Sequence, residues 1–384
     1  MFRQGVTLFR LLGFEVRVDA SWLLLAVLIV WSLAAGWFPQ AAPGLATAAY
    51  WWMGVLGLLG LAFSIVVHEF AHALVARRHA MPIHGITLFA FGGVAEMGGE
   101  PPSPRAEFLM AIAGPLTSLG LAALFRLGEG ALPAGPVAAV VGYLAFINLA
   151  LAIFNMIPAF PLDGGRVLRS ALRAWRKNVL WATRVASAGG SVFAFLLMAL
   201  GLFSLIQGAV VVGVWWFLIG LFVRAAAIGG YREQVARSAL SGQPVRRFMR
   251  SDPVAVEAQT TLQTLVDDYF YRHWRKSFPV VEDGRLTGCV SLDALRDFER
   301  TEWPMRRVRA VMAPCDQANT VGQDEDAATA LGRMREGGRG RLYVTDAVGR
   351  LVGVLALRDL VDYLEVRTGI EAIGDGRRGL REAS

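Results

Sequence analysis

Five apolar stretches without a charged side chain constrain the fold of this 384-residue chain more than any other feature. They cover residues 20–38, 50–67, 108–125, 131–162 and 185–223. An apolar run of about 20 residues can cross a bilayer as a helix. The fourth stretch has room for one span and a loop, and the fifth suits two spans joined by a tight turn near Gln207 and Gly208. The sequence therefore predicts six membrane helices.

Charged side chains concentrate in the second part of the chain. Residues 1–235 hold 24 of them and residues 236–384 hold 45, which indicates a membrane half followed by a soluble half. Two cysteines in the whole chain exclude a disulfide scaffold. The N-terminus shows no pattern of a cleaved signal peptide, so we expect the first span to be retained.

The distribution of basic residues predicts the orientation in the membrane. Most of the formal net charge of +7 comes from the membrane half, which has 15 basic and 9 acidic residues. Arginines gather at the N-terminus, after the second span and in residues 163–184, whereas residues 39–49 carry no charge. Since basic loops stay inside, we expect both termini in the cytoplasm and the chain in the plasma (inner) membrane. The soluble half has no basic stripe with interleaved aromatics, so no nucleic-acid partner is expected.

The second apolar stretch ends in the sequence HEFAH, which predicts a metal site. His68 and His72 are four residues apart, so a helix places both imidazoles on one face. Glu69 lies beside them and can act as the general base on a metal-held water, as in zinc hydrolases. A chance match or a packed polar cluster is the alternative. Three ionisable groups in a span are costly without compensation, and a metal ion would supply it.

A catalytic zinc usually takes a third protein ligand, and the best candidate is a carboxylate. Asp163 is the only acidic residue between 131 and 184, and it lies where the fourth stretch meets the cytoplasm. Arg77 and Arg78 place the end of the HEFAH helix on the same side, so the groups can meet at one depth. The alternative is that Asp163 serves as a helix cap or turn residue.

These motifs resemble those of the site-2 protease family of intramembrane zinc metalloproteases. The resemblance rests on HEFAH within a span, followed by N-x-x-P-x-x-P-L-D-G-G at residues 155–165, and on residues 91–97 and 111–120. It implies one Zn²⁺ per chain held by His68, His72 and Asp163, with Glu69 activating water. The motif asparagine corresponds to Asn155, which would stabilise the oxyanion or hold the substrate. A lone asparagine in a span can instead bond a neighbouring helix. The chain lacks the PDZ-like insertion of one branch of the family.

A short β-hairpin is expected over residues 83–97, with its turn at Gly92 and Gly93. In the site-2 protease family a similar edge receives the substrate as an added strand. A structured loop without substrate contact is the alternative.

Residues 245–364 contain an internal repeat with an offset of 63 residues. VRRFM at residues 245–249 returns as VRAVM at 308–312, and FPVVEDGRLTGCV returns as LYVTDAVGRLVGVL. Each copy reads helix, strand, strand, helix. The repeat resembles a tandem pair of CBS domains, which implies an adenosine nucleotide as ligand. Ser291 keeps the hydroxyl position of that motif and Asp359 keeps the ribose-binding position, whereas Ala294 and Ala356 replace their counterparts. A dimerising module without ligand is the alternative.

The predicted fold is a polytopic α-helical membrane protein with a C-terminal α/β tandem CBS pair. The expected function is intramembrane cleavage of transmembrane segments of regulatory proteins, such as an anti-sigma or pro-sigma factor, under control of the CBS pair, which could also form a homodimer. A CBS-gated transporter and an inactive scaffold are the alternatives. The transporter reading would require broken helices in repeated halves, and the scaffold reading conflicts with the complete set of chemical groups. The expected domains are the protease domain (1–230), a linker (231–244), the two CBS domains (245–305 and 306–368) and a tail (369–384).

Overall fold

The computed structural model describes residues 6–11, 13–81, 83–89, 92–97, 100–316 and 318–367. The chain divides into two compact units, Met1–Gln234 and Val235–Ser384, which are described separately below.

The first unit is a bundle of membrane helices, as predicted. Among the described residues, six helices are long and apolar enough to cross a membrane. The first span contains α1 (Ser21–Ser32), a π-helical turn, η1 (Leu33–Trp37), and α2 (Phe38–Ala41). The other five are α3 (Thr47–Arg78), α4 (Pro104–Ala131), α5 (Pro136–Asn155), α7 (Val179–Ile206) and α8 (Val210–Leu240).

The longest uncharged stretch forms the predicted hairpin of two spans, α7 and α8. Gly208 lies in its turn with a φ of +81°, a conformation that favours glycine. Further along the hairpin, a Cβ on Gly201 would lie 2.6 Å from the backbone nitrogen of Phe217, and one on Gly220 would lie 2.7 Å from the carbonyl oxygen of Ala194. The glycines therefore allow the two helix backbones to approach closely, as is common between membrane helices.

A small sheet accompanies the bundle. Its order is β1 (Val6–Leu11), β2 (Phe14–Val18), β3 (Ile83–Phe89) and β4 (Gly92–Met97), so β1 and β4 form the edges. The pair β2–β3 is parallel and the other two pairs are antiparallel. The N-terminal strands were not predicted. The parallel partner of β2 lies about 70 residues away and leaves no local signal, whereas β1 pairs with β2 as a local antiparallel hairpin.

The predicted hairpin is present, but the prediction of its turn at Gly92 and Gly93 is wrong. Gly92 pairs with Phe89 and Gly93 with Leu88, so both glycines belong to β4. The connection is the two-residue segment 90–91, which lies outside the described residues. Pairing register selects the loop length in a hairpin, and the Gly-Gly signal could not reveal that register.

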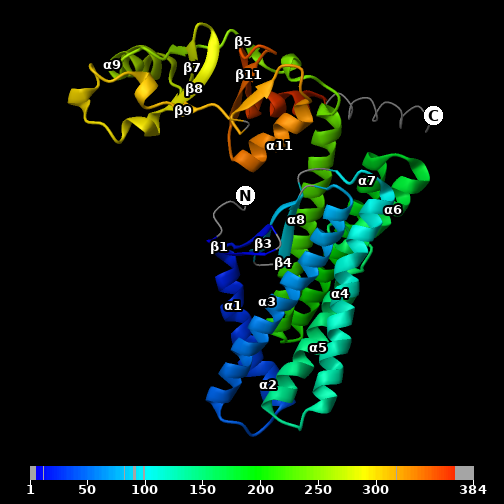
Figure 1. The fold of residues 1–384 in the computed structure, drawn as a ribbon. Coiled ribbons are helices and arrows are strands. Elements are labelled where there is room, and N and C mark those ends of the chain that lie inside the picture. The colour runs from blue at the N-terminus through cyan, green and yellow to red at the C-terminus, as the bar shows by residue number, and fades with distance from the viewer. Residues whose placement is uncertain are drawn as a thin grey trace. The chain divides into compact units, whose positions relative to one another are not determined.

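Helix α4 lies at the centre of the first unit, in contact with α3, α5 and the short helix α6 (Asp163–Arg176). Helix α6 also packs against α7. Within this unit, α6 and the small sheet lie at one end of the bundle, and the connection between α2 and α3 lies at the other end (Figure 1). The element that begins with Asp163 and the predicted edge strands thus share one end of the membrane helices.

The second unit contains two four-stranded mixed sheets, one for each repeat. The strand orders are β6-β7-β8-β9 and β10-β11-β12-β5. The short strands β5 (Arg250–Ser251) and β9 (Ala313–Pro314) each belong to one repeat but pair with the sheet of the other, so the two repeats interlock. The remaining strands are β6 (Val256–Glu257), β7 (Ser277–Glu282), β8 (Arg285–Ser291), β10 (Thr320–Gly322), β11 (Arg341–Thr345) and β12 (Leu351–Ala356).

Helical segments complete each repeat. The first repeat ends in a short 3₁₀ turn, η4 (Leu292–Leu295), rather than the expected helix, whereas residues 357–367 of the second repeat are helical. The other helical elements are η2 (Val245–Arg247), α9 (Leu262–Thr264), η3 (Leu265–Phe270), α10 (Tyr271–His273), η5 (Arg300–Glu302), η6 (Val308–Ala310) and α11 (Ala327–Gly337).

Each repeat has its own hydrophobic core. Ala236 and Leu240, at the end of α8, belong to the core of the second repeat together with Val245 and Phe248. Part of the segment expected as a linker is therefore helical and buried within the second unit.

Candidate active site

Two histidines and one aspartate converge inside the first unit. His68 and His72 lie on one face of α3 and are 5% and 8% exposed. Asp163 is the first residue of α6. Its Oδ2 lies 3.2 Å from the Nε2 of each histidine, and the two Nε2 atoms are 3.1 Å apart. Among the described residues, these three side chains form the one cluster whose donor atoms could share a metal ion.

The outer ring nitrogens of both histidines are held by α4. The Nδ1 of His72 lies 2.7 Å from the carbonyl oxygen of Met110, and the Nδ1 of His68 lies 2.9 Å from the Oγ of Ser118. A carbonyl oxygen only accepts, so the Nδ1 of His72 donates and its Nε2 carries a lone pair toward Asp163. Such outer bonds orient metal-binding histidines in known sites.

The donor set fits zinc. A lone pair on the Nε2 of His72 and a carboxylate oxygen of Asp163 would repel each other at 3.2 Å unless a cation or proton lay between them. Two imidazoles and one carboxylate are a common set of ligands for catalytic zinc, which leaves a further position for water. The chemistry of these three groups is thus that of a Zn²⁺ site.

Helix α4 passes the histidines so closely that only glycine fits at the crossing. A Cβ on Gly114 would lie 2.3 Å from the Nε2 of His72 and 2.6 Å from the Nε2 of His68. Both distances are far below a normal contact, so a side chain here would displace the donor atoms themselves. Gly114 and Ser118 are four residues apart, on the same face of α4.

The two glycines after Asp163 let α6 begin against the preceding loop. A Cβ on Gly164 would lie 2.3 Å from the carbonyl oxygen of Met156, and one on Gly165 would lie 2.3 Å from the backbone nitrogen of Phe160. The loop is anchored to α7 because the Phe160 nitrogen donates to the carbonyl oxygen of Ala186 at 3.1 Å. The position of Asp163 therefore depends on close backbone packing, not on glycine flexibility.

Glu69 and Asn155, the other predicted site residues, are not part of this cluster. Glu69 follows His68 in α3 and is half-buried. Asn155 is the last residue of α5, and its Nδ2 donates to the carbonyl oxygen of Leu151 at 3.0 Å within the same helix. The structure gives a direct contact with the three converging groups for neither side chain. Their catalytic roles stay predictions.

The contacts that α4 makes with the histidines are not among the features predicted from the sequence. Gly114 and Ser118, spaced by four residues in an apolar span, carry a signal that could have indicated a shared face. The carbonyl of Met110 has no such signal, since every residue has one and packing alone selects it.

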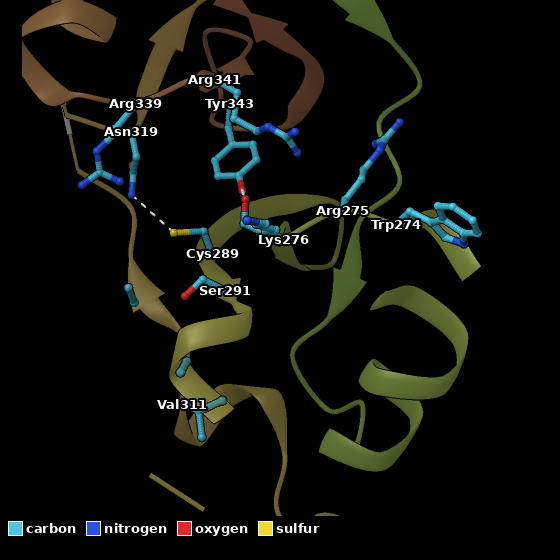
Figure 2. Close-up of a pocket in the computed structure, with 14 residues that line it drawn as sticks. Trp274, Arg275, Lys276, Cys289, Ser291, Val311, Asn319, Arg339, Arg341 and Tyr343 are labelled. Atoms are coloured by element: carbon cyan, nitrogen blue, oxygen red, sulfur yellow. Dashed lines mark hydrogen bonds between the residues drawn. The ribbon is translucent and has the colours of Figure 1, made fainter. Parts of the chain in front are cut away.

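The second unit contains a pocket of about 530 Å³ lined by residues of both repeats. Ser291 lines it, together with four basic side chains, Arg275, Lys276, Arg339 and Arg341. No carboxylate is among the described residues that line it. Figure 2 shows these cations around the pocket together with the aromatic rings of Tyr343 and Trp274. The pocket is suited to an anion.

Asp359 does not line this pocket. Its carboxylate accepts from the Nε of Arg250 at 3.1 Å and from the Nη2 of the same residue at 2.5 Å. These hydrogen bonds raise the pKa of Arg250. Ala294, which replaces the motif aspartate of the first repeat, does line the pocket. The two residues predicted for a nucleotide, Ser291 and Asp359, thus have different surroundings.

Known proteins match both units. The family model "Peptidase family M50" matches residues 56–132 and 126–200, and the CBS domain model matches 245–300 and 308–366. Rip3 of Mycobacterium tuberculosis is 35% identical over 373 residues, covering 95% of this chain and 94% of Rip3. Zinc metalloprotease MJ0392 of Methanocaldococcus jannaschii is 27% identical over 372 residues, with 94% and 96% covered. The solved site-2 protease of the same archaeon is 27% identical, with a TM-score of 0.45, over 59% of this chain and 94% of that chain.

The fold and the converging groups define a multi-pass membrane zinc metalloprotease with a C-terminal pair of CBS domains. The chain belongs to peptidase family M50, the site-2 protease family. The predicted fold class and enzyme class are confirmed. The CBS-gated transporter is not supported, because the relatives match along almost the whole chain.

Proposed function

We propose that this protein is an intramembrane endopeptidase that cuts transmembrane segments of other membrane proteins. The observation that carries the proposal is the convergence of His68, His72 and Asp163 between helices that are long and apolar enough to span a bilayer. A hydrolytic site among such helices suits a substrate that also lies in the membrane.

In the proposed mechanism, His68, His72 and Asp163 would hold the zinc ion. When bound, zinc would polarise the scissile carbonyl and acidify a water molecule. The carboxylate of Glu69 accepts a proton from the attacking water and returns it to the amide nitrogen of the leaving peptide. Asn155 would exchange its bond to the Leu151 carbonyl for one to the substrate carbonyl oxygen.

The substrate helix has to unwind before cleavage, because a helical peptide bond is shielded by its own turn. Strand β4 is an edge of the small sheet and offers unpaired backbone groups to an extended segment. Helix-breaking or small residues near the cut would lower the cost of unwinding. Anti-sigma and pro-sigma factors, which hold such segments, are the proposed class of substrate.

The decisive experiment compares Glu69→Gln with the wild type. The change is nearly isosteric, so we expect zinc content and fold to be kept while cleavage of a model transmembrane substrate is lost. Glu129→Gln, near the C-terminal end of the neighbouring helix α4, is the matched control. Membrane proteins that accumulate in cells with the first variant only are candidate substrates. Wild-type cleavage by Glu69→Gln would show that another group is the base.

We also propose that both termini face the cytoplasm of a plasma (inner) membrane. The support is the separation of charge: the uncharged residues 39–49 connect spans at one end of the bundle, and the arginine-rich α6 lies at the other (Figure 1). Reporter fusions after Ser384 and within residues 39–49 should report opposite sides. A C-terminus outside the cytoplasm would overturn the topology.

For the second unit we propose regulation by an adenosine nucleotide bound in the pocket beside Ser291. The four basic side chains would face its phosphates, and the aromatic rings offer stacking partners for the base. The carboxylate of Asp359 forms an ion pair with Arg250, so it could hold a ribose only if that ion pair opened. A homodimer through these domains is a further proposal.

Calorimetry of the full-length protein with ATP, ADP and AMP tests the nucleotide. We expect Arg341→Met to weaken nucleotide binding and Asp359→Ala to leave it unchanged, since Arg341 lines the pocket and Asp359 does not. If none of the three nucleotides gave heat of binding, dimerisation or partner docking would remain as the role of the two CBS domains. Analytical ultracentrifugation in detergent tests the dimer, and wild-type activity after deletion of residues 236–384 would reject regulation.

A further inference from the structure

A buried charge cluster links α4, which contacts the two histidines, to α6, which carries Asp163. Glu107, in the first turn of α4, is fully buried, and Arg169 of α6 is 7% exposed. The Nε and Nη2 of Arg169 both contact Oε1 of Glu107. Arg173 of α6 approaches Oε2 of Glu107 at 3.7 Å. Two arginines of α6 thus face one carboxylate of α4.

The position of Glu107 on α4 connects this cluster to the zinc site. Glu107, Gly114 and Ser118 are spaced by seven and four residues, so they lie along one face of the helix. That face contacts His68 and His72 near its middle and Arg169 at its beginning. Helix α4 therefore contacts the histidines directly, and it is joined to α6, the helix that carries Asp163, by the ion pairs of Glu107.

The cluster also fixes the surroundings of α6. The guanidinium of Arg169 lies 5.6 Å from the centre of the Phe160 ring, in the loop that precedes Asp163. Arg173 donates to the carbonyl oxygen of Pro101 at 2.9 Å, just before α4 begins. A buried charge is costly unless it is paired with good geometry, so loss of one partner forces the helices to rearrange.

We propose that Glu107 is a positioning residue of the zinc site, which acts through Arg169 to hold Asp163 at bonding distance from the two histidines. If the two helices only had to pack together, apolar side chains could fill the same space without the desolvation cost of a buried ion pair. The planar fork of Arg169, with two nitrogens on one oxygen, fixes direction as well as distance. The inference rests on the proposed zinc site.

The test measures metal binding rather than proteolysis. Zinc affinity is determined by competition with a chromophoric chelator, and cobalt substitution reports ligand geometry through its visible absorption. We expect Glu107→Gln to weaken zinc binding about 10- to 100-fold and to alter the cobalt spectrum, as for other residues that orient metal ligands. Glu129→Gln is the control, because it makes the same change to an ion pair at the exposed end of the same helix.

Arg169→Lys is the second variant, since it keeps the positive charge but removes the fork. We expect it to fold and to share the weakened zinc binding and altered spectrum. Wild-type affinity and spectrum in a folded Glu107→Gln or Arg169→Lys protein would overturn the inference. Failure of both variants to fold would also count against it, because the pair would then be needed for the fold rather than for ligand position. A wild-type protein that binds no zinc would instead refute the proposed function.

Discussion

Replacement of Gly114 by alanine is the sharpest test of the proposed zinc site. An added Cβ would lie 2.3 Å from the Nε2 of His72 and 2.6 Å from the Nε2 of His68, whereas a relaxed contact needs about 3.5 Å. Either α4 retreats from α3 by roughly 1 Å, or the rings turn away from Asp163. Their Nδ1 bonds to α4 oppose rotation.

The expected magnitude follows from this displacement. A misplacement of about 1 Å at a site can cost on the order of 100-fold in rate, and loss of ligand orientation costs about 10- to 100-fold in metal affinity. We therefore expect Gly114→Ala to lower zinc affinity by at least about 10-fold and to abolish most cleavage. Overpacking costs about 1–3 kcal/mol, and the better helix propensity of alanine offsets about 1 kcal/mol of it, so global stability should fall by at most about 2 kcal/mol.

Gly120→Ala is the matched control on the same helix. A Cβ at Gly120 would meet nothing within 4 Å, so the variant should bind zinc as the wild type does. The assay is zinc titration of both purified variants, with circular dichroism to confirm equal helix content. Wild-type zinc affinity in Gly114→Ala would refute the reasoning, since the added Cβ would clash with the donor atoms themselves.

Three further predictions concern single contacts. Ser118→Ala should lower zinc affinity about 10- to 100-fold in the same titration, because it removes the hydrogen-bond partner of His68, one of the proposed zinc ligands. An unchanged affinity would exclude this role. Gly230→Ala should destabilise the fold by about 1–3 kcal/mol in thermal unfolding, since its Cβ would lie 2.3 Å from the Phe160 ring. Gly229→Ala is the control, because a Cβ there would meet open space, and equal melting temperatures of the two variants would contradict the prediction. Burial raises the pKa of the Cys315 thiol to about 12, so the thiol stays protonated at pH 8. Iodoacetamide should therefore alkylate Cys315 at least about tenfold more slowly in the folded protein than in the unfolded chain, and equal rates would contradict this prediction.

The sequence alone determined the features that depend on near neighbours. Six spans follow from the length of uncharged runs, because each helix has to satisfy its backbone within the bilayer by itself. The shared face of His68 and His72 follows from the helical repeat of α3. The tandem repeat of the second half is visible as direct self-similarity and is matched by two CBS domains.

Only the tertiary structure decided which distant groups meet. The sequence made Asp163 a candidate by its depth, but its place beside the histidines depends on loop packing and on α4. The close approach of Gly114 to the histidines, the buried ion pair of Glu107 with Arg169 and the strands exchanged between the repeats also depend on packing between distant elements. Asp359 matches a motif, yet Arg250 engages its carboxylate. A helical or strand period is set within a few residues, whereas contacts between residues about 50 or more apart arise from how whole elements pack, which no local pattern encodes.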